Sequence, residues 1–178
     1  PQINSNSPLC LNDPLQLTAT AGVNANFRWF SANGFSSVQQ NPQIASVNYS
    51  DSGQYAAFVI INGCVSDTTF TKIEIDQPAV VNAGNDQVVC ANNAVVQLNG
   101  SVSGGTNTGV WTSNGSGRFG TRTSSLTNSY IPSTQDTANG LVTLTLSSTN
   151  NKSCRIINST LSIRITDAPF VDIGNNKT

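Results

Sequence analysis

The chain has 178 residues, of which 37% are hydrophobic and only 10% are charged, and its formal net charge is −1. This composition supports a folded core and argues against a chain held open by self-repulsion. Its 8 Lys and Arg residues form no cluster, which excludes electrostatic binding of nucleic acid. No apolar run approaches the roughly 20 residues of a membrane-spanning helix, so we expect no membrane insertion.

A repeated pattern of cysteine and tryptophan divides the sequence. Cys10, Trp29 and Cys64 are followed in the same order by Cys90, Trp111 and Cys154. The segment VNAGND at 81–86 is echoed by VDIGNN at 171–176, an offset of 90 residues (171 − 81 = 90). We therefore expect one domain over residues 1–77, a second over 78–167 and the start of a third repeat over 168–178. The opening on Pro1 and the lack of Met and of a signal peptide predict an internal fragment or mature region.

Short alternating segments between clusters of Gly, Asn, Pro and Ser predict antiparallel β-structure. In the first domain the expected strands are 15–19, 27–30, 43–47, 54–61 and 65–75. The last two meet at Asn62-Gly63, a strong signal for a β-hairpin turn. Near the end of the last strand Ile73 alternates with Lys72 and Glu74, which predicts one buried and one solvated face.

The motif Asp51-Ser52-Gly53-Gln54-Tyr55 is the tyrosine-corner signature of immunoglobulin-like (Ig-like) sandwiches, in which the phenol bonds to nearby backbone. With Trp29 on a preceding strand, it predicts a two-sheet sandwich that buries Trp29 and Tyr55. The cysteines do not occupy the antibody positions. A bridge is therefore expected to staple an edge of the sandwich rather than cross its core.

The second domain repeats this pattern, with Trp111 in the core and with expected strands 95–98, 109–112, 129–131, 141–147 and 154–166. In strand 141–147, Val142, Leu144 and Leu146 alternate with Leu141, Thr143 and Thr145. Residues 133–139 are expected to form one helical turn at most. The corner motif is missing, and Tyr130-Ile131-Pro132 stands before the penultimate strand, so the sandwich is a divergent variant. The predicted fold class is all-β, with two tandem Ig-like or PKD-like sandwiches.

Four cysteines in two symmetric pairs suit an oxidising compartment. They permit three pairings. Repeat symmetry favours Cys10–Cys64 and Cys90–Cys154, because each domain must be able to fold alone. Each such bridge would stabilise its domain by about 4 kcal/mol. Four buried free thiols are the alternative.

Catalytic groups are scarce, and we expect no enzyme. The chain has no His to activate a nucleophile, and its single Glu, Glu74, is expected to face solvent. No catalytic or cofactor-binding residue is predicted. A structural calcium ion is a minor hypothesis, because Asp76, Asn82, Asn85 and Asp86 gather oxygen ligands near the joint between the domains. Ordinary turn formation by Asn and Asp is the alternative.

Several motifs carry a family resemblance. In the first domain they are Asn6-Ser7-Pro8-Leu9-Cys10 and Asn62-Gly63-Cys64, and in the second Ala83-Gly84-Asn85-Asp86-Gln87 and Tyr130-Ile131-Pro132. The chain resembles the tandem Ig-like and PKD-like repeats of giant Bacteroidetes cell-surface proteins, exported by type IX secretion and typified by SprB-like gliding-motility adhesins. The resemblance implies an extracellular location in a cell-surface filament.

Two functions are expected to compete. The first is a non-catalytic repeat of a secreted cell-surface filament or adhesin, in gliding motility or surface attachment. Its partners would be neighbouring repeats of the same chain, and the fragment itself is expected to be monomeric. The alternative is a carbohydrate- or ligand-binding ancillary module of a secreted multidomain enzyme, with extracellular polysaccharide as partner. Exposed aromatic rings favour sugar binding. The candidates are Phe30, Phe35 and Phe58, for which packing at the edge of the core is the other explanation.

Overall fold

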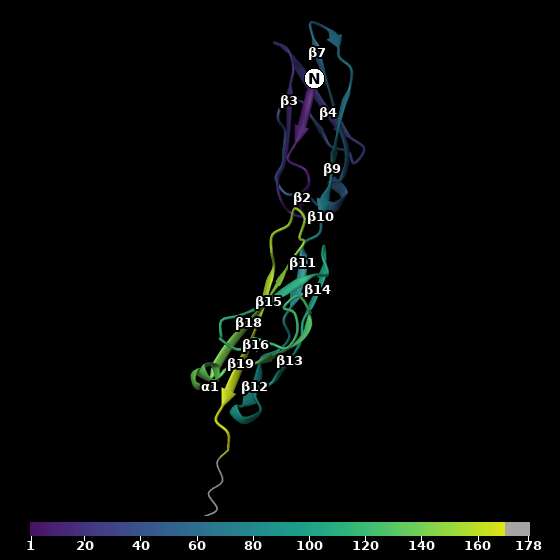
Figure 1. Cartoon of the computed structure of the whole chain (residues 1–178). Coiled ribbons are helices and arrows are strands. Elements are labelled where there is room, and N and C mark those ends of the chain that lie inside the picture. The colour runs from purple at the N-terminus through teal and green to yellow at the C-terminus, as the bar shows by residue number, and fades with distance from the viewer. Residues whose placement is uncertain (170–178) are drawn as a thin grey trace, which may run out of the picture. The chain divides into compact units, whose positions relative to one another are not determined.

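The computed structural model describes residues 1–169, and in this part the chain forms two compact units (Figure 1). Unit 1 consists of Pro1–Pro78 together with Asn151–Arg155. Unit 2 consists of Ala79–Asn150 and, within the described part of the chain, residues 156–169. The predicted third repeat over 168–178 lies almost entirely outside the described residues.

Unit 1 is built from short antiparallel sheets. One contains β1 (Gln2–Ser5), β3 (Leu15–Thr20) and β6 (Gln43–Ile44). The other runs β5 (Ser36–Ser37), β4 (Asn26–Ser31), β7 (Gly53–Ile61) and β8 (Cys64–Val65), and β9 (Thr69–Ile73) also pairs with β7. In addition β2 (Leu9–Cys10) pairs in parallel with β10 (Ile75–Asp76).

The core of unit 1 follows from strand alternation. Leu15, Leu17 and Ala19 of β3 point inward, whereas the residues between them are exposed. Trp29 and Tyr55 are buried in the same core, and the Trp29 indole N–H donates to the Gln40 carbonyl oxygen over 3.3 Å. The two sheets therefore form a sandwich around this cluster.

The predicted tyrosine corner is present. The hydroxyl of Tyr55 donates to the carbonyl oxygen of Asp51 over 3.1 Å and accepts from the Asn33 side-chain amide over 3.2 Å. Just before it, the 3₁₀ turn η1 (Tyr49–Asp51) begins at Asn48, whose side chain accepts from the backbone N–H of Ser50. The motif thus folds locally as its sequence predicts.

Unit 2 has a four-stranded sheet in the order β12 (Gln87–Cys90), β19 (Asn158–Thr166), β18 (Leu141–Ser148) and β15 (Gly109–Ser113). A second sheet contains β13 (Val96–Asn99), β17 (Thr127–Ile131) and β16 (Arg118–Phe119). The pair β11 (Ala79–Asn82) and β14 (Ser101–Gly104) completes the strands, and the 3₁₀ turn η2 (Ala91–Asn93) follows β12.

Alternation also sets the core of unit 2. Val142, Leu144 and Leu146 of β18 are buried, as the sequence predicts, and pack with Trp111. Space beside the indole ring is limited: a β-carbon placed on Gly100 would lie 2.6 Å from a Trp111 ring atom. Glycine at position 100 therefore lets the backbone approach the ring.

Some elements differ from the prediction. The strand expected over 65–75 is divided into β8, β9 and β10. The strand expected over 154–166 begins at Asn158, because Asn151–Arg155 belongs to unit 1. The helix α1 (Thr134–Asn139) has 6 residues and so exceeds one turn.

Both predicted disulfide pairings, Cys10–Cys64 and Cys90–Cys154, are wrong. A single disulfide joins Cys10 to Cys154 with a Cα–Cα distance of 4.8 Å, across a sequence separation of 144, and Cys64 and Cys90 are exposed free thiols. The physical reason is placement. Cys64 lies on β8, in a different sheet from Cys10, and Cys154 lies in unit 1 whereas Cys90 lies in unit 2.

Candidate functional site

The outer face of the larger sheet of unit 1 carries exposed aromatic side chains. Phe30 of β4 and Phe70 of β9 are the register partners of Ala56 on β7, one from each side. Phe30 is 43% exposed and Phe70 is 57% exposed, whereas Ala56 is buried. Directly opposed residues in antiparallel strands share a face, so the two rings flank a small residue.

A shallow depression lies between these rings. Its lining is formed by Phe30, Ser31, Ala32, Gln54, Ala56 and Phe70. The ring of Phe58 approaches that of Phe30 edge-on, with a centroid distance of 6.2 Å. We call Phe30, Ala56, Phe58 and Phe70 the aromatic face. Aromatic ring faces can pack against the apolar face of a sugar ring, and the Gln54 amide beside them can hydrogen-bond to its hydroxyl groups.

The three aromatic candidates from the sequence have different positions. Phe30 is exposed, and Phe58 is half-buried against it. Phe35 instead packs on the core, with its ring 5.2 Å from that of Tyr55. Phe70 was not predicted, although the outward direction of Lys72 two residues later indicates it.

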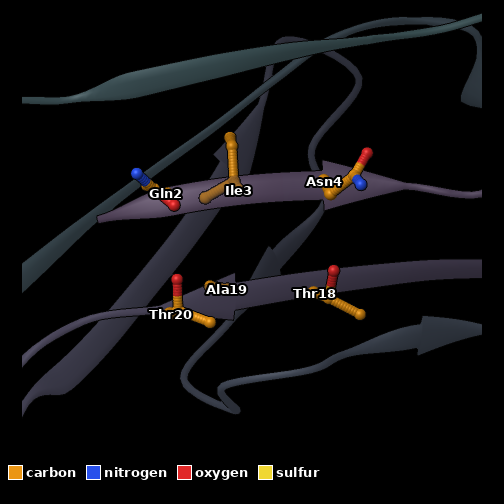
Figure 2. Close-up of a pocket in the computed structure, with 6 residues that line it drawn as sticks. All are labelled: Gln2, Ile3, Asn4, Thr18, Ala19 and Thr20. Atoms are coloured by element: carbon orange, nitrogen blue, oxygen red, sulfur yellow. The ribbon is translucent and has the colours of Figure 1, made fainter.

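A second depression lies over the β1–β3 pair, and Figure 2 shows the six residues that line it. They are Gln2, Ile3, Asn4, Thr18, Ala19 and Thr20. They form three register pairs of the antiparallel ladder. The lining offers amide and hydroxyl groups and no titratable side chain, so it provides hydrogen bonds but no acid or base.

The calcium candidates are divided between the units. Asp76 lies on β10 of unit 1, whereas Asn82, Asn85 and Asp86 lie in unit 2. One Asp86 carboxylate oxygen accepts from the Ser162 backbone N–H over 2.7 Å, and the Asn82 side chain accepts from Gly84 over 2.8 Å. Within residues 1–169 no group of three or more His, Cys, Asp or Glu side chains is arranged to hold a metal ion. The calcium site stays a prediction.

Asp76 has a different role, because it anchors the segment Asn151–Arg155. One carboxylate oxygen accepts from the Ser153 hydroxyl over 2.8 Å and from its backbone N–H over 3.3 Å, and the other lies 3.3 Å from the Lys152 ammonium. Burial raises the pKa of Asp76, but the bonds from Ser153 and the charge of Lys152 outweigh it and leave that pKa below its ordinary value. The adjacent Cys154 completes the attachment by its disulfide to Cys10.

Unit 2 contains a buried carboxylate that the sequence did not reveal. Asp136, in α1, is 1% exposed. It accepts from the Tyr130 hydroxyl over 2.9 Å and from the backbone N–H groups of Ser116, Gly117 and Ser133 over 2.8, 2.8 and 3.0 Å. A β-carbon on Gly117 would lie 2.6 Å from the Tyr130 hydroxyl oxygen, so the loop approaches closely only as glycine.

These bonds define the chemistry of Asp136. Burial raises the pKa of the carboxyl, but the four donors outweigh that effect and hold the pKa of Asp136 below its ordinary value. Burial also raises the pKa of the Tyr130 phenol, which stays protonated and donates. Asp136 is therefore an ionised structural acceptor. The signal in the sequence is the capping-box spacing Ser133-x-x-Asp136 at the start of α1.

No protein-family model matches the chain, and no curated protein sequence matches it. Among solved structures, the insect immune protein hemolin aligns with a TM-score of 0.47 and 14% identity over 90% of this chain and 44% of that chain. The N-terminal eight Ig domains of Down syndrome cell adhesion molecule align with a TM-score of 0.41 and 16% identity, over 92% and 23% of the two chains. The fibronectin(III)-like modules of Clostridium thermocellum CbhA give a TM-score of 0.40 and 10% identity, over 99% and 100%.

The chain thus spans less than half the length of the first two solved structures that it resembles. The all-β, tandem Ig-like fold itself follows from the two sandwiches and the tyrosine corner described above. Within residues 1–169 no helix has the length and apolar character needed to cross a membrane.

Proposed function

We propose that this chain is a non-catalytic repeat segment of a large secreted filament or adhesin at the cell surface, in gliding motility or surface attachment. The resemblance of its motifs to Bacteroidetes surface repeats motivates the proposal, and type IX secretion would be the export route. The observation that carries it is the way unit 1 is completed. Residues Asn151–Arg155 come from the connection between β18 and β19 and are fastened by the Cys10–Cys154 disulfide.

This arrangement suits a structural segment outside the cell. A disulfide that closes a long stretch of chain persists in an oxidising compartment and is rare in the cytosol. The polar, weakly charged composition suits a surface that solvates the chain without binding nucleic acid. The buried carboxylate Asp136 is fully used by backbone and phenol donors, as a structural group would be.

The location and role are tested on intact cells of the producing organism. Antibodies raised against this chain should label unpermeabilised cells, and deletion of its coding segment in frame should reduce attachment or gliding. A deletion of equal length in an unrelated surface protein is the control. Labelling only after permeabilisation would contradict the proposal.

The second candidate function is binding of polysaccharide by an ancillary module, and the aromatic face is the observation that favours it. Affinity electrophoresis in gels containing soluble polysaccharides is the direct test. Retardation that is lost in Phe30→Ala and in Phe70→Ala, and kept in Tyr49→Ala, would establish this function. Tyr49 is a matched control because it is an aromatic residue of unit 1, 49% exposed and outside the aromatic face. Equal mobility of all chains in every gel would rule it out.

A further inference from the structure

The two free thiols occupy the same places in the fold as the two ends of the disulfide. Cys10 is the register partner of Asp76 in the parallel pair of β2 with β10, the last strand of unit 1. Cys90 is the register partner of Thr166 in the parallel pair of β12 with β19, the last strand of unit 2. In both units a proline follows the partner residue of the cysteine within three positions, Pro78 after Asp76 and Pro169 after Thr166. Cys90 is therefore the counterpart of Cys10.

Cys64 and Cys154 correspond in the same way. In unit 1 the register partner of Trp29 is Ala57, and Cys64 follows it by seven residues (64 − 57 = 7). In unit 2 the register partner of Trp111 is Leu146, and Cys154 follows it by eight (154 − 146 = 8). Each cysteine thus follows the strand paired with the tryptophan strand at a similar distance, Cys64 on β8 and Cys154 in the connection between β18 and β19.

Of the two corresponding positions Cys10 and Cys90, one is in a disulfide and one is a free thiol. The same holds for Cys154 and Cys64. Cys10 and Cys154 are bonded to each other, whereas Cys64 and Cys90 are exposed thiols. Cys64 directly follows the tight turn Asn62-Gly63, whose two residues have φ angles of 50° and 82°. The Thr166 hydroxyl lies 3.9 Å from the Cys90 sulfur, and no disulfide occupies this position.

We propose that Cys90 forms a disulfide with the Cys64-type cysteine of another sandwich unit. Cys64 in turn forms a disulfide with the Cys90-type cysteine of a further unit. The occupant is a second unit of this kind, and a second copy of this chain supplies one. The bond that already joins Cys10 to Cys154 shows the geometry that such a pairing repeats. The inference rests on the repeat role proposed above for its partner in the cell, but its chemistry is tested with the purified chain.

The reaction is thiol–disulfide exchange with a small-molecule disulfide such as oxidised glutathione. The Cys90 sulfur bonds to one glutathione sulfur, and the oxidant's S–S bond breaks and releases one glutathione thiol with a proton. The Cys64 sulfur of the second copy then attacks the Cys90 sulfur and displaces the other glutathione as a thiol. Two protein thiols are oxidised, and one glutathione disulfide is reduced to two glutathione molecules.

The test uses single-thiol chains in a glutathione redox buffer. Cys64→Ser retains only Cys90 as a free thiol, and Cys90→Ser retains only Cys64, because both chains keep the Cys10–Cys154 disulfide. An equimolar mixture should give at least fivefold more dimer linked Cys64 to Cys90 than either self-linked dimer, measured from linked peptides by mass spectrometry without reduction. Random pairing of accessible thiols gives only about twice as many mixed dimers as either self-linked kind.

A matched control moves the thiol by two residues on the same strand. Val88 of β12 is 69% exposed, so the chain Cys64→Ser, Cys90→Ser, Val88→Cys presents an accessible thiol outside the Cys10-like position. It should pair with Cys64 no better than at random. The proposal is overturned by a random ratio for the Cys90 chain, by thiols that take glutathione without forming dimers, or by a Cys64–Cys90 link inside one wild-type chain. Failure of antibodies to label intact cells would instead contradict the proposed repeat role and leave the disulfide pairing unaffected.

Discussion

Among the individual residues, Asp136 shows most clearly how this chain stabilises a charge without a cation. No Lys or Arg is needed, because a phenol and three backbone N–H groups donate to its two oxygens. These donors come from the loop 116–117, from β17 and from the start of α1. The carboxylate therefore connects three segments that alternation alone does not bring together.

The pH dependence of unit 2 should reveal this carboxylate. Since the pKa of Asp136 is lower in the folded chain than the value near 4 of an unfolded chain, the unfolded chain binds the proton more readily. The stabilisation is therefore fully present above about pH 4 and declines as the pH falls through the lowered pKa. In urea unfolding, Asp136→Asn should lower the free energy of unfolding at pH 7 by about 3 kcal/mol and flatten its dependence on pH in the acid range. Asp167→Asn, at an exposed carboxylate, is the control and should change the free energy of unfolding at pH 7 by less than about 0.5 kcal/mol.

The hydroxyls of Tyr55 and Tyr130 should differ in importance. Tyr55→Phe removes a hydroxyl that donates to the Asp51 carbonyl oxygen, which should cost about 1 kcal/mol. Tyr130→Phe removes a donor to the buried Asp136 carboxylate, which should cost about 2–3 kcal/mol because bonds to charged groups are stronger. Equal losses in chemical denaturation of the two variants would mean that Asp136 gains little from the phenol.

At the scale of elements, the connection between β18 and β19 is the distinctive feature. It leaves the strands of unit 2 and gives Asn151–Arg155 to unit 1, where Ser153 and Lys152 bond to Asp76. The corresponding hairpin of unit 1 turns at Asn62-Gly63 and continues directly into β8. The longer of the two connections is thus the one whose cysteine, Cys154, is bonded within this chain.

Removal of the Cys10–Cys154 disulfide should destabilise the chain strongly. The bond closes a sequence separation of 144, for which chain-entropy arguments give a loss of about 3–5 kcal/mol on removal. The double variant Cys10→Ser, Cys154→Ser should show this loss in chemical denaturation. The matched double variant Cys64→Ser, Cys90→Ser changes only exposed thiols and should stay within about 0.5 kcal/mol of the parent. Similar losses in both would argue against the assigned pairing.

The individual elements also show how much of the structure could be predicted from the sequence. The alternation of β18, the burial direction of Ile73 and the corner at Tyr55 depend on local patterns, and the prediction was correct for them. The cysteine pairing failed because equal spacing of cysteines does not imply equal connections between strands. The aromatic face was half predicted, since Phe30 is exposed but Phe35 packs on the core. The Asp136 cluster needs contacts between distant segments, which no local pattern specifies.

For the whole molecule, low charge density predicts how any surface attachment responds to salt. The chain carries 8 basic and 9 acidic residues among 178, so long-range attraction is weak. Retention of the purified chain on its target surface should change less than about twofold between 50 and 500 mM NaCl, because screening removes only an electrostatic share. A quartz-crystal microbalance gives this measurement. A steep loss at high salt would show that charge, rather than hydrogen bonding and ring contacts, drives attachment.

The disulfide also sets how the molecule extends when it is pulled at both ends. Tension enters along β1 and β2, crosses from Cys10 to Cys154 through the sulfur atoms, and leaves along β19, so the covalent path bypasses the 144 residue steps between them. At about 3.5 Å per extended residue, roughly 50 nm of contour is withheld while the bond is intact. Stretching in an atomic force microscope should recover this length only with a reductant present. Such a segment yields little under drag in an oxidising medium and becomes long and compliant once it is reduced.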